Sequence, residues 1–527
     1  MNTLKRFFVN ASISSIVSVA LRIVGIYFTV WLSGTIGEEG MGIYSLTNSV
    51  YKLGITFASS GIGFAATRII AEELEKKNSR EALRAAERCI AFSFLLGTLT
   101  AVFFYTCSGF LGEVFLGDLR AVASIKVMCV SLPFLVMSSV INAYFTGVRH
   151  LVKPSICMVS EQIIRVGVTM LLLRDFDGTN LEYGCLAVIF GGVVAEICSF
   201  LMSYIFYVFD KRDYDVGNIK KTRLNKRVAS IALPVALSSY IRSGLLTLEH
   251  MMIPSGLKKR GVDPSRALGL YGIISGMVFP ILFFPSAFLY AASDLVVPEF
   301  AACNASGNIT RTRRLSNKVM QLTSFFSVGV AGVLYGFSDE LGRILYHNEE
   351  VGIYLKTLAP LVIVMFFDHL ADAILKGLDK QLSVVGYNVI DSVLSVFLVW
   401  VLVPEFGIGG YIFVVWFGEV VNCILSSVSL VKTTGIKIRF GNWLLYPGVA
   451  IVSSLVIVKN GLRYLHGNVA ATGWSLTVAI ILSILIYALI MRVIGCITLG
   501  DYKLLCRMFA KPSRNQKAYK EKHRQSI

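Results

Sequence analysis

Long apolar stretches recur along the whole 527-residue chain, separated by short polar segments. Each stretch can form a helix of about 20 residues, the length that crosses a bilayer. They are much longer than barrel strands, and backbone groups in hydrocarbon must be paired internally, so helices are the expected form. The pattern predicts an all-α polytopic membrane protein with about fourteen transmembrane helices. The expected spans are 9–33, 43–67, 89–110, 122–146, 155–173, 184–208, 228–252, 268–296, 316–337, 355–375, 382–402, 407–430, 442–459 and 472–495.

Composition and charge agree with this assignment. The chain is 55% hydrophobic and 16% charged, far from the values of soluble globular proteins. The net charge of +17 is unevenly distributed, because Lys and Arg gather in alternate polar segments. The most basic are Arg68 to Arg88, Lys211 to Arg227, Arg311 to Lys318 and the tail from Arg492. The positive-inside rule therefore places both termini in the cytoplasm of a multi-pass plasma-membrane protein, and nucleic acid is not an expected partner.

One outward segment breaks this rule. The stretch "SGLKKRGVDPSRA" carries four basic residues on the side where few are expected. Either this loop has a specific role, or the seventh and eighth spans are misplaced.

The order of residues indicates an internal repeat. The second and eighth spans begin with Gly-x-Tyr and end at a glutamate 28 residues after the tyrosine, namely Tyr44 to Glu72 and Tyr271 to Glu299. The fifth and eleventh spans share a spacing of fourteen, from Gly147 to Glu161 and from Gly377 to Asp391. The sixth and twelfth share a spacing of twelve, from Gly184 to Glu196 and from Gly407 to Glu419. Arg22 in the first span corresponds to Arg242 in the seventh.

The repeat predicts two six-helix bundles in the same orientation, related by an axis along the membrane normal. The expected divisions are an N-terminal bundle at 1–210, a basic cytoplasmic linker at 211–227, a C-terminal bundle at 228–431, two further helices within 442–496, and a basic cytoplasmic tail at 497–527. Transporters built this way place their substrate site between the bundles.

Three cations lie inside predicted spans, where charge is costly. Arg22 shares a helical face with small and polar residues that include Ser18, and Lys52 shares one with Asn48. Arg242 lies two turns before Glu249. If the three cations meet in one cavity, their field favours an anion, and the arginine fork suits a diphosphate. The alternative is that Glu249 neutralises Arg242 while Lys52 reaches an interface.

The candidate substrate-binding residues are therefore Arg22, Lys52, Arg242, Asn48, Ser18 and Glu249. Asp294, Asp368 and Asp372 are candidates for a coupling ion, whereas Glu161 and Arg165 are expected to pair with each other. Glu196, Asp391 and Glu419 are expected to pair polar groups between helices. The ten cysteines and six histidines are dispersed without a metal-ligand spacing, and no nucleophile motif occurs. We expect neither an enzyme nor a metal site.

Two sequence stretches are similar to a known family. "LRIVG…IGEEGMGIYSL" and "GIGFAATRIIAEE" resemble the multidrug/oligosaccharidyl-lipid/polysaccharide (MOP) exporter superfamily, and within it polysaccharide-biosynthesis proteins of the stage V sporulation protein B type, which are related to lipid II flippases. The resemblance implies alternating-access flipping of an undecaprenyl-diphosphate-linked saccharide from the inner to the outer leaflet. It also implies that Arg22 is a cavity arginine and that Lys52 takes the place of a basic residue in the second helix. Lipid II flippases carry another arginine where this chain has Phe28, which is consistent with a narrower or different head group.

Two alternatives remain at this point: a cation-coupled multidrug exporter of the same superfamily, and a non-transporting membrane scaffold. The flippase interpretation implies a polyprenyl-diphosphate-linked saccharide and membrane lipids as partners, a monomer, and no cofactor. Coupling to the membrane potential or to a monovalent cation is compatible with it.

Overall fold

The computed structural model describes residues 2–59, 61–76, 78–148, 150, 152–176, 178, 180–211, 224–436, 441–466 and 472–496. The predicted linker 211–227 lies largely outside the described residues, and the predicted tail 497–527 lies wholly outside them. Helices account for nearly all of the described chain, which contains no strand, and the predicted all-α fold is thus confirmed.

The helices of the first half are α1 (Asn2–Ser59), α2 (Ile62–Glu75), α3 (Ser79–Thr106), α4 (Ser108–Phe110), η1 (Leu111–Leu116), α5 (Ala121–Gly147), α6 (Val152–Leu172) and α7 (Leu181–Lys211). Those of the second half are α8 (Leu224–Lys259), α9 (Pro264–Gly272), η3 (Ile273–Val278), α10 (Phe279–Phe283), α11 (Ser286–Ala305), α12 (Ile309–Gly336), α13 (Ser338–Leu345), α14 (Glu349–Leu358), α15 (Leu361–Gly377), α16 (Gln381–Phe406) and α17 (Ile408–Thr434). The last helices are η4 (Gly441–Leu445), α18 (Tyr446–His466) and α19 (Gly473–Val493). We call α1–α7 the N-lobe and α8–α17 the C-lobe.

The number of spans agrees with the sequence, but two boundaries do not. Thirteen described helices are long and apolar enough to cross a membrane, and α14 with α15, bent by 51°, forms a fourteenth candidate. The predicted separation of spans 9–33 and 43–67 falls where helix α1 breaks, at Gly37 (φ 70°), but a one-residue break replaces the longer loop that the sequence predicted. The predicted span 268–296 is divided among α9, η3, α10 and α11. A left-handed break at one glycine lets the chain reverse without a polar loop.

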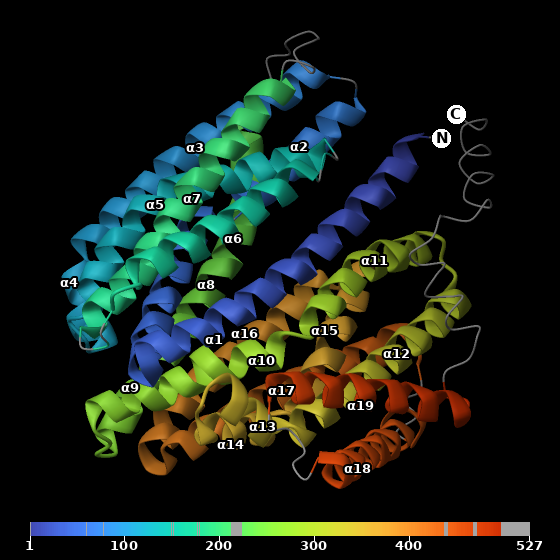
Figure 1. Cartoon of the computed structure of the whole chain (residues 1–527). Coiled ribbons are helices and arrows are strands. Elements are labelled where there is room, and N and C mark those ends of the chain that lie inside the picture. Colours follow the sequence, from blue (N-terminus) through green and yellow to red (C-terminus); the bar gives the residue numbers. More distant parts are fainter. Residues whose placement is uncertain are drawn as a thin grey trace.

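The first helix of each lobe also contacts the other lobe. Figure 1 shows α2–α7 grouped on one side, α9–α19 on the other and α1 passing between them, while α8 extends from the C-lobe in among the helices of the first group. Val228 and Ala232, near the start of α8, belong to the buried apolar cluster of α2, α3, α5 and α7. Conversely, Arg22 of α1 donates hydrogen bonds to Phe283 and Ser286 of the C-lobe. Contacts between the lobes thus continue along much of their length.

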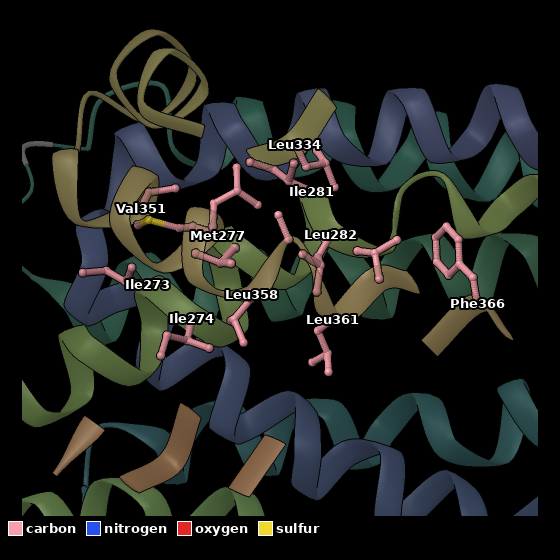
Figure 2. Packing of buried hydrophobic residues seen from close by; sticks show 14 of the residues in the cluster. Ile273, Ile274, Met277, Ile281, Leu282, Leu334, Val351, Leu358, Leu361 and Phe366 are labelled. Atoms are coloured by element: carbon pink, nitrogen blue, oxygen red, sulfur yellow. The ribbon is translucent and has the colours of Figure 1, made fainter. Parts of the chain in front are cut away.

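The C-lobe core is built around the broken helix α9–η3–α10. Figure 2 shows Ile273, Met277 and Leu282 of this segment beside Val351 and Leu358 of α14, with Leu361 and Phe366 of α15 continuing the same cluster. Most of these side chains are almost fully buried. Burial of this apolar surface fixes the broken helix against the bent pair α14–α15.

The two appended helices cover α12 through a stripe of small residues. A Cβ atom at Gly329 would lie 2.9 Å from the ring of Tyr487 in α19. One at Gly332 would lie 2.3 Å from Ile451 in α18. The glycines therefore allow α18 and α19 to pack closely on the C-lobe.

Candidate functional site

A cavity of about 430 Å³ lies between the lobes. Helix α1 contributes Ser45, Asn48, Ser49 and Lys52, and α8 contributes Leu246, Glu249 and His250. The remaining lining residues come from α9–α10 and from α15, α16 and α17. Three of the predicted substrate-binding residues, Asn48, Lys52 and Glu249, are therefore brought together here.

The charge of this cavity differs from the prediction. Lys52 is the one Lys or Arg among the described residues that line it, whereas Glu249, Asp391 and Glu419 supply three carboxylates. The expectation that Arg22, Lys52 and Arg242 converge on one cavity is wrong for this conformation, since neither arginine lines it. The sequence interpretation placed Asp391 and Glu419 between helices, and it did not foresee that they would face a cavity.

Arg22 lies next to this cavity and bonds to the C-lobe. Its guanidinium donates to the carbonyl oxygen of Phe283 at 3.3 Å and to Ser286 Oγ at 3.0 Å, and lies 5.0 Å from the ring centre of Tyr290. Phe283 is itself a lining residue of the cavity. These three contacts of Arg22 are all with uncharged groups, so a phosphate oxygen would replace them with stronger, charge-assisted bonds. Ser18, one turn earlier on α1, is exposed and does not line the cavity.

Arg242 is electrostatically attracted to carboxylates of the C-lobe. Its charge interacts with Asp372, Asp391 and Glu419. The alternative pairing of Arg242 with Glu249 does not occur within the described residues, where the charges that act on Glu249 are those of Asp391 and Glu419. Arg242 therefore balances the acidic wall of the cavity from outside it.

The predicted ion-coupling residues lie deeper in the C-lobe. Asp368 accepts a hydrogen bond from Asn422 Nδ2 at 2.9 Å, and Asp372 accepts one from Ser426 Oγ at 2.9 Å. Both aspartates are buried between α15 and α17 and neither lines the cavity. The side chain of Asp294, in α11, lies outside the described residues. Within the described part of the chain, His, Cys, Asp and Glu form no group of three that could hold a metal ion.

The end of the molecule opposite the start of α1 is closed by direct backbone contact. A Cβ atom at Gly42 would lie 2.2 Å from the carbonyl oxygen of Leu268, and one at Gly272 would lie 2.2 Å from that of Glu38. Only glycine permits α1 and α9 to approach so closely. Gly42 and Gly269 are the glycines of the two Gly-x-Tyr sequences that mark the repeat, but that pattern does not predict this contact.

A group of ion-paired and hydrogen-bonded side chains lies beside this glycine contact. We call this group the clasp, and its members are Glu38, Arg266, Asn348 and Glu350. Arg266 donates to Glu38 Oε1 at 2.9 Å and also to Glu350, while Asn348 Nδ2 donates to Glu38 Oε2 at 3.2 Å. Glu38 belongs to the N-lobe and the other three to the C-lobe.

The basic loop that breaks the positive-inside rule forms part of this closed end. Besides Arg266, Lys258 donates to the carbonyl oxygen of Gly117 in the N-lobe at 3.2 Å, and Arg260 donates to that of Glu405 at 2.5 Å. Arg120, in the connection before α5, pairs with Glu39 at 2.7 Å and with Asp118, whose hydrogen bonds raise the pKa of the Arg120 guanidinium. The loop therefore joins the lobes, and its excess of positive charge was the signal in the sequence.

The profile of the polysaccharide biosynthesis protein family matches residues 7–301. The chain belongs to this family. This chain is 22% identical over 443 residues to stage V sporulation protein B of Bacillus subtilis (strain 168), and the match covers 82% of this chain and 85% of that protein. It is 21% identical to sporulation protein YkvU of the same organism, over 70% of this chain and 82% of the relative.

Solved structures show the same fold. The lipid II flippase MurJ in an inward closed conformation matches with a TM-score of 0.66 at 12% identity, covering 92% of this chain and 98% of that one. An inward-facing multidrug resistance MATE family transporter of the MOP superfamily matches with a TM-score of 0.62 at 16% identity, over 80% and 98% of the two chains. The predicted relation to polysaccharide-biosynthesis proteins of the stage V sporulation protein B type is confirmed by the family profile and by the curated relative, and these solved structures confirm the fold.

Proposed function

We propose that this protein is an alternating-access flippase that moves an undecaprenyl-diphosphate-linked saccharide from the inner to the outer leaflet. The observation that carries the proposal is the inter-lobe cavity, in which Lys52 and Asn48 face inward and beside which Arg22 holds only neutral partners among the described residues. Membership of the polysaccharide biosynthesis family supports a saccharide as the transported group. Both termini lie in the cytoplasm in this proposal, and the protein acts as a monomer in the plasma membrane.

Recognition of the diphosphate uses the cations of α1. Lys52 offers a point charge inside the cavity, and the Arg22 fork offers bidentate hydrogen bonds to phosphate oxygens. Arg22 must first leave Phe283 and Ser286, which are weaker acceptors because they are uncharged. Binding of the anion thus releases α1 from the C-lobe beside the cavity.

Delivery to the other leaflet requires the closed end to open. In the proposed orientation this end faces outward, so Gly42 must separate from Leu268 and the clasp must break. The saccharide then leaves through the gap while the lipid tail remains in the membrane. The acidic wall formed by Glu249, Asp391 and Glu419 offers acceptors for sugar hydroxyl groups.

Energy coupling to a monovalent cation or to the membrane potential belongs to the same proposal. Asp368 and Asp372 remain the residues that we assign to a coupling ion, with Asp294 as a third candidate from the sequence. Asp368 Oδ1 and Asn422 Oδ1 are buried and have no hydrogen-bond partner in the described chain. Unpaired buried acceptors side by side favour an additional cation or proton.

Native mass spectrometry of the purified protein tests the substrate. The wild-type protein should retain a polyprenyl-diphosphate saccharide from membrane lipids, whereas Lys52→Ala and Arg22→Ala should lose most of it. Lys126→Ala is the matched control, because Lys126 is an exposed lysine on α5 whose ammonium lies 5.9 Å from the ring centre of Tyr105 in α3, and neither residue lines the cavity. Equal retention by all four proteins, or retention of phospholipid alone, would contradict the proposal.

A cation-coupled multidrug exporter is the second candidate, and the three carboxylates of the cavity favour it. Such an exporter should bind lipophilic cations with an affinity that falls when Glu249 or Glu419 is replaced by glutamine. If a lipophilic cation binds in this way while no lipid diphosphate is retained, the exporter becomes the better account.

A further inference from the structure

A buried polar network connects α1 to the interior of the N-lobe. The hydroxyl of Tyr51 donates to the carboxylate of Glu196 and lies 2.5 Å from Ser131 Oγ. Arg165 Nη2 lies 2.8 Å from Glu161 Oε1 and 3.8 Å from Glu196 Oε1, so the expected Glu161–Arg165 pair is confirmed and extended. Glu196 is only 8% exposed. Removing one member of such a network leaves a buried charge or acceptor unpaired, which makes the network a strong constraint.

The segment of α1 that this network contacts has a backbone break on either side. Gly37, with φ of 70°, interrupts the helix before it, and Gly61, with φ of 81°, interrupts it after Ser59. A helical segment between two breaks can turn about its own axis more easily than one continued at both ends. Successive residues are about 100° apart around a helix, so a turn of one residue would remove Lys52 from the cavity.

Tyr51 and Lys52 are adjacent and point to different surroundings. Tyr51 enters the N-lobe network, while Lys52 and Asn48, four residues apart on one face, line the cavity. We propose that Tyr51, held by Glu196 and Arg165, is a positioning residue that fixes the rotation of α1 so that Asn48 and Lys52 face the cavity. The importance of that face rests on the proposed function, but the rotation itself does not.

The second repeat explains why this network is specific to the N-lobe. Asp391 and Glu419 correspond to Glu161 and Glu196, but Ser395 stands where the N-lobe has Arg165, and Val278 stands where it has Tyr51. Without these partners, Asp391 and Glu419 line the cavity instead of closing a network. One pair of repeated carboxylates thus positions a helix in the N-lobe, while its counterpart borders the substrate space.

Cysteine accessibility tests the positioning role, after the ten native cysteines are replaced. Asn48→Cys should react rapidly with a water-soluble thiol reagent, and Val50→Cys slowly, because Val50 is 1% exposed. Adding Tyr51→Phe, which removes only the hydroxyl group, should lower the ratio of the two rates by about tenfold, the effect of losing a hydrogen bond to a charged group. Glu196→Gln keeps an acceptor for Tyr51 and should preserve most of the ratio.

Tyr144→Phe is the matched control. It removes a hydroxyl that donates to the buried carboxylate of Asp210 at 3.0 Å in the same lobe, and Tyr144 belongs to the buried cluster formed by α2, α3, α5, α7 and the start of α8. A merely structural role for Tyr51 would lower the unfolding temperature in both phenylalanine variants and leave both rate ratios unchanged. That outcome, in protein extracted at normal levels, would overturn the inference. If Tyr51→Phe is not recovered folded, the same rate ratio is measured in Glu196→Gln and Glu196→Leu. The inference predicts a lower ratio in Glu196→Leu, which removes the acceptor for Tyr51, and equal ratios would overturn it.

Lipid retention separates this inference from the proposed function. If the rate ratio falls in Tyr51→Phe but lipid diphosphate retention is unchanged, the positioning role stands and Lys52 is not a substrate residue. If retention falls while the ratio is unchanged, Tyr51 does not control the rotation of α1.

Discussion

The clasp gives a quantitative expectation for the closed end. Replacing Glu38 by alanine removes two hydrogen bonds that cross between the lobes, from Arg266 at 2.9 Å and from Asn348 at 3.2 Å. The side chains of Glu38 and Arg266 are 35% and 40% exposed, so solvent screens the pair. Contacts of this kind contribute about 0.2–1 kcal/mol each, and the variant should favour opening by about 0.5–2 kcal/mol.

This free energy corresponds to a change of about 2- to 30-fold in the ratio of open to closed molecules. The ratio can be measured as a distance distribution between spin labels introduced by Leu119→Cys and Ile353→Cys. These residues are 65% and 57% exposed and lie at the closed end, one in each lobe. The long-distance population should grow in Glu38→Ala, and higher ionic strength should reproduce part of the growth in the unmodified clasp.

Asp339→Ala is the control for this experiment. Asp339 forms an ion pair with Lys356 at 3.4 Å at the same end of the molecule, but both residues belong to the C-lobe. Its removal should leave the distance distribution unchanged. An unchanged distribution in Glu38→Ala, or equal growth in both variants, would show that the clasp does not hold the lobes together.

Three further outcomes are expected. Gly272→Ala places a Cβ atom 2.2 Å from the carbonyl oxygen of Glu38 and should prevent full closure in the same spin-label measurement. Gly192→Ala, whose Cβ atom would have no atom within 4 Å, should close normally. Full closure in Gly272→Ala would contradict the backbone contact. Arg242→Ala should abolish complementation of a strain that depends on this protein while membrane levels stay near normal, because the acidic wall loses its counter-charge, and wild-type growth would refute this. An impermeant thiol reagent applied to whole cells should label cysteines in the 254–267 loop and spare those in 211–227 and at the C-terminus, and the reverse pattern would overturn the orientation.

The general architecture could be predicted from the sequence because it depends on local patterns. Apolar runs of about 20 residues predict membrane helices whatever their neighbours are. Repeated spacings to Glu196 and Glu419 indicate two related bundles without any knowledge of contacts. A break between residues 33 and 43 was predicted, but its form was not, because the residues around Gly37 also fit a polar loop and only the backbone conformation distinguishes the two.

The candidate site could be predicted only in part, because its charges act across the lobes. The polar face shared by Asn48 and Lys52 predicted that both residues border a cavity, and both line it in the structure. The partners of Arg22 lie 261 and 264 residues away along the chain, and no local spacing reveals them. The replacement of Arg165 by Ser395 between the repeats was visible in the sequence, and it is the signal that could have placed Asp391 and Glu419 at the cavity.

The central claim is that the lobes must separate at the clasp to deliver a lipid-linked saccharide, and a reversible disulfide tests it most directly. A Cβ atom at Gly269 would lie 3.2 Å from Glu38 Cγ, close to the distance of about 3 Å between a sulfur and the partner Cβ in a disulfide. The variant with Glu38→Cys and Gly269→Cys, in a background without other cysteines, should therefore cross-link on oxidation.

Transport is then followed in proteoliposomes that contain a fluorescent polyprenyl-diphosphate saccharide, with an impermeant quencher to report its leaflet. The oxidised protein should still retain the lipid but should not move it, and reduction should restore movement, while the two single-cysteine variants should be insensitive to oxidation. If the fully cross-linked protein moves the lipid as fast as the reduced protein, alternating access through the clasp is refuted.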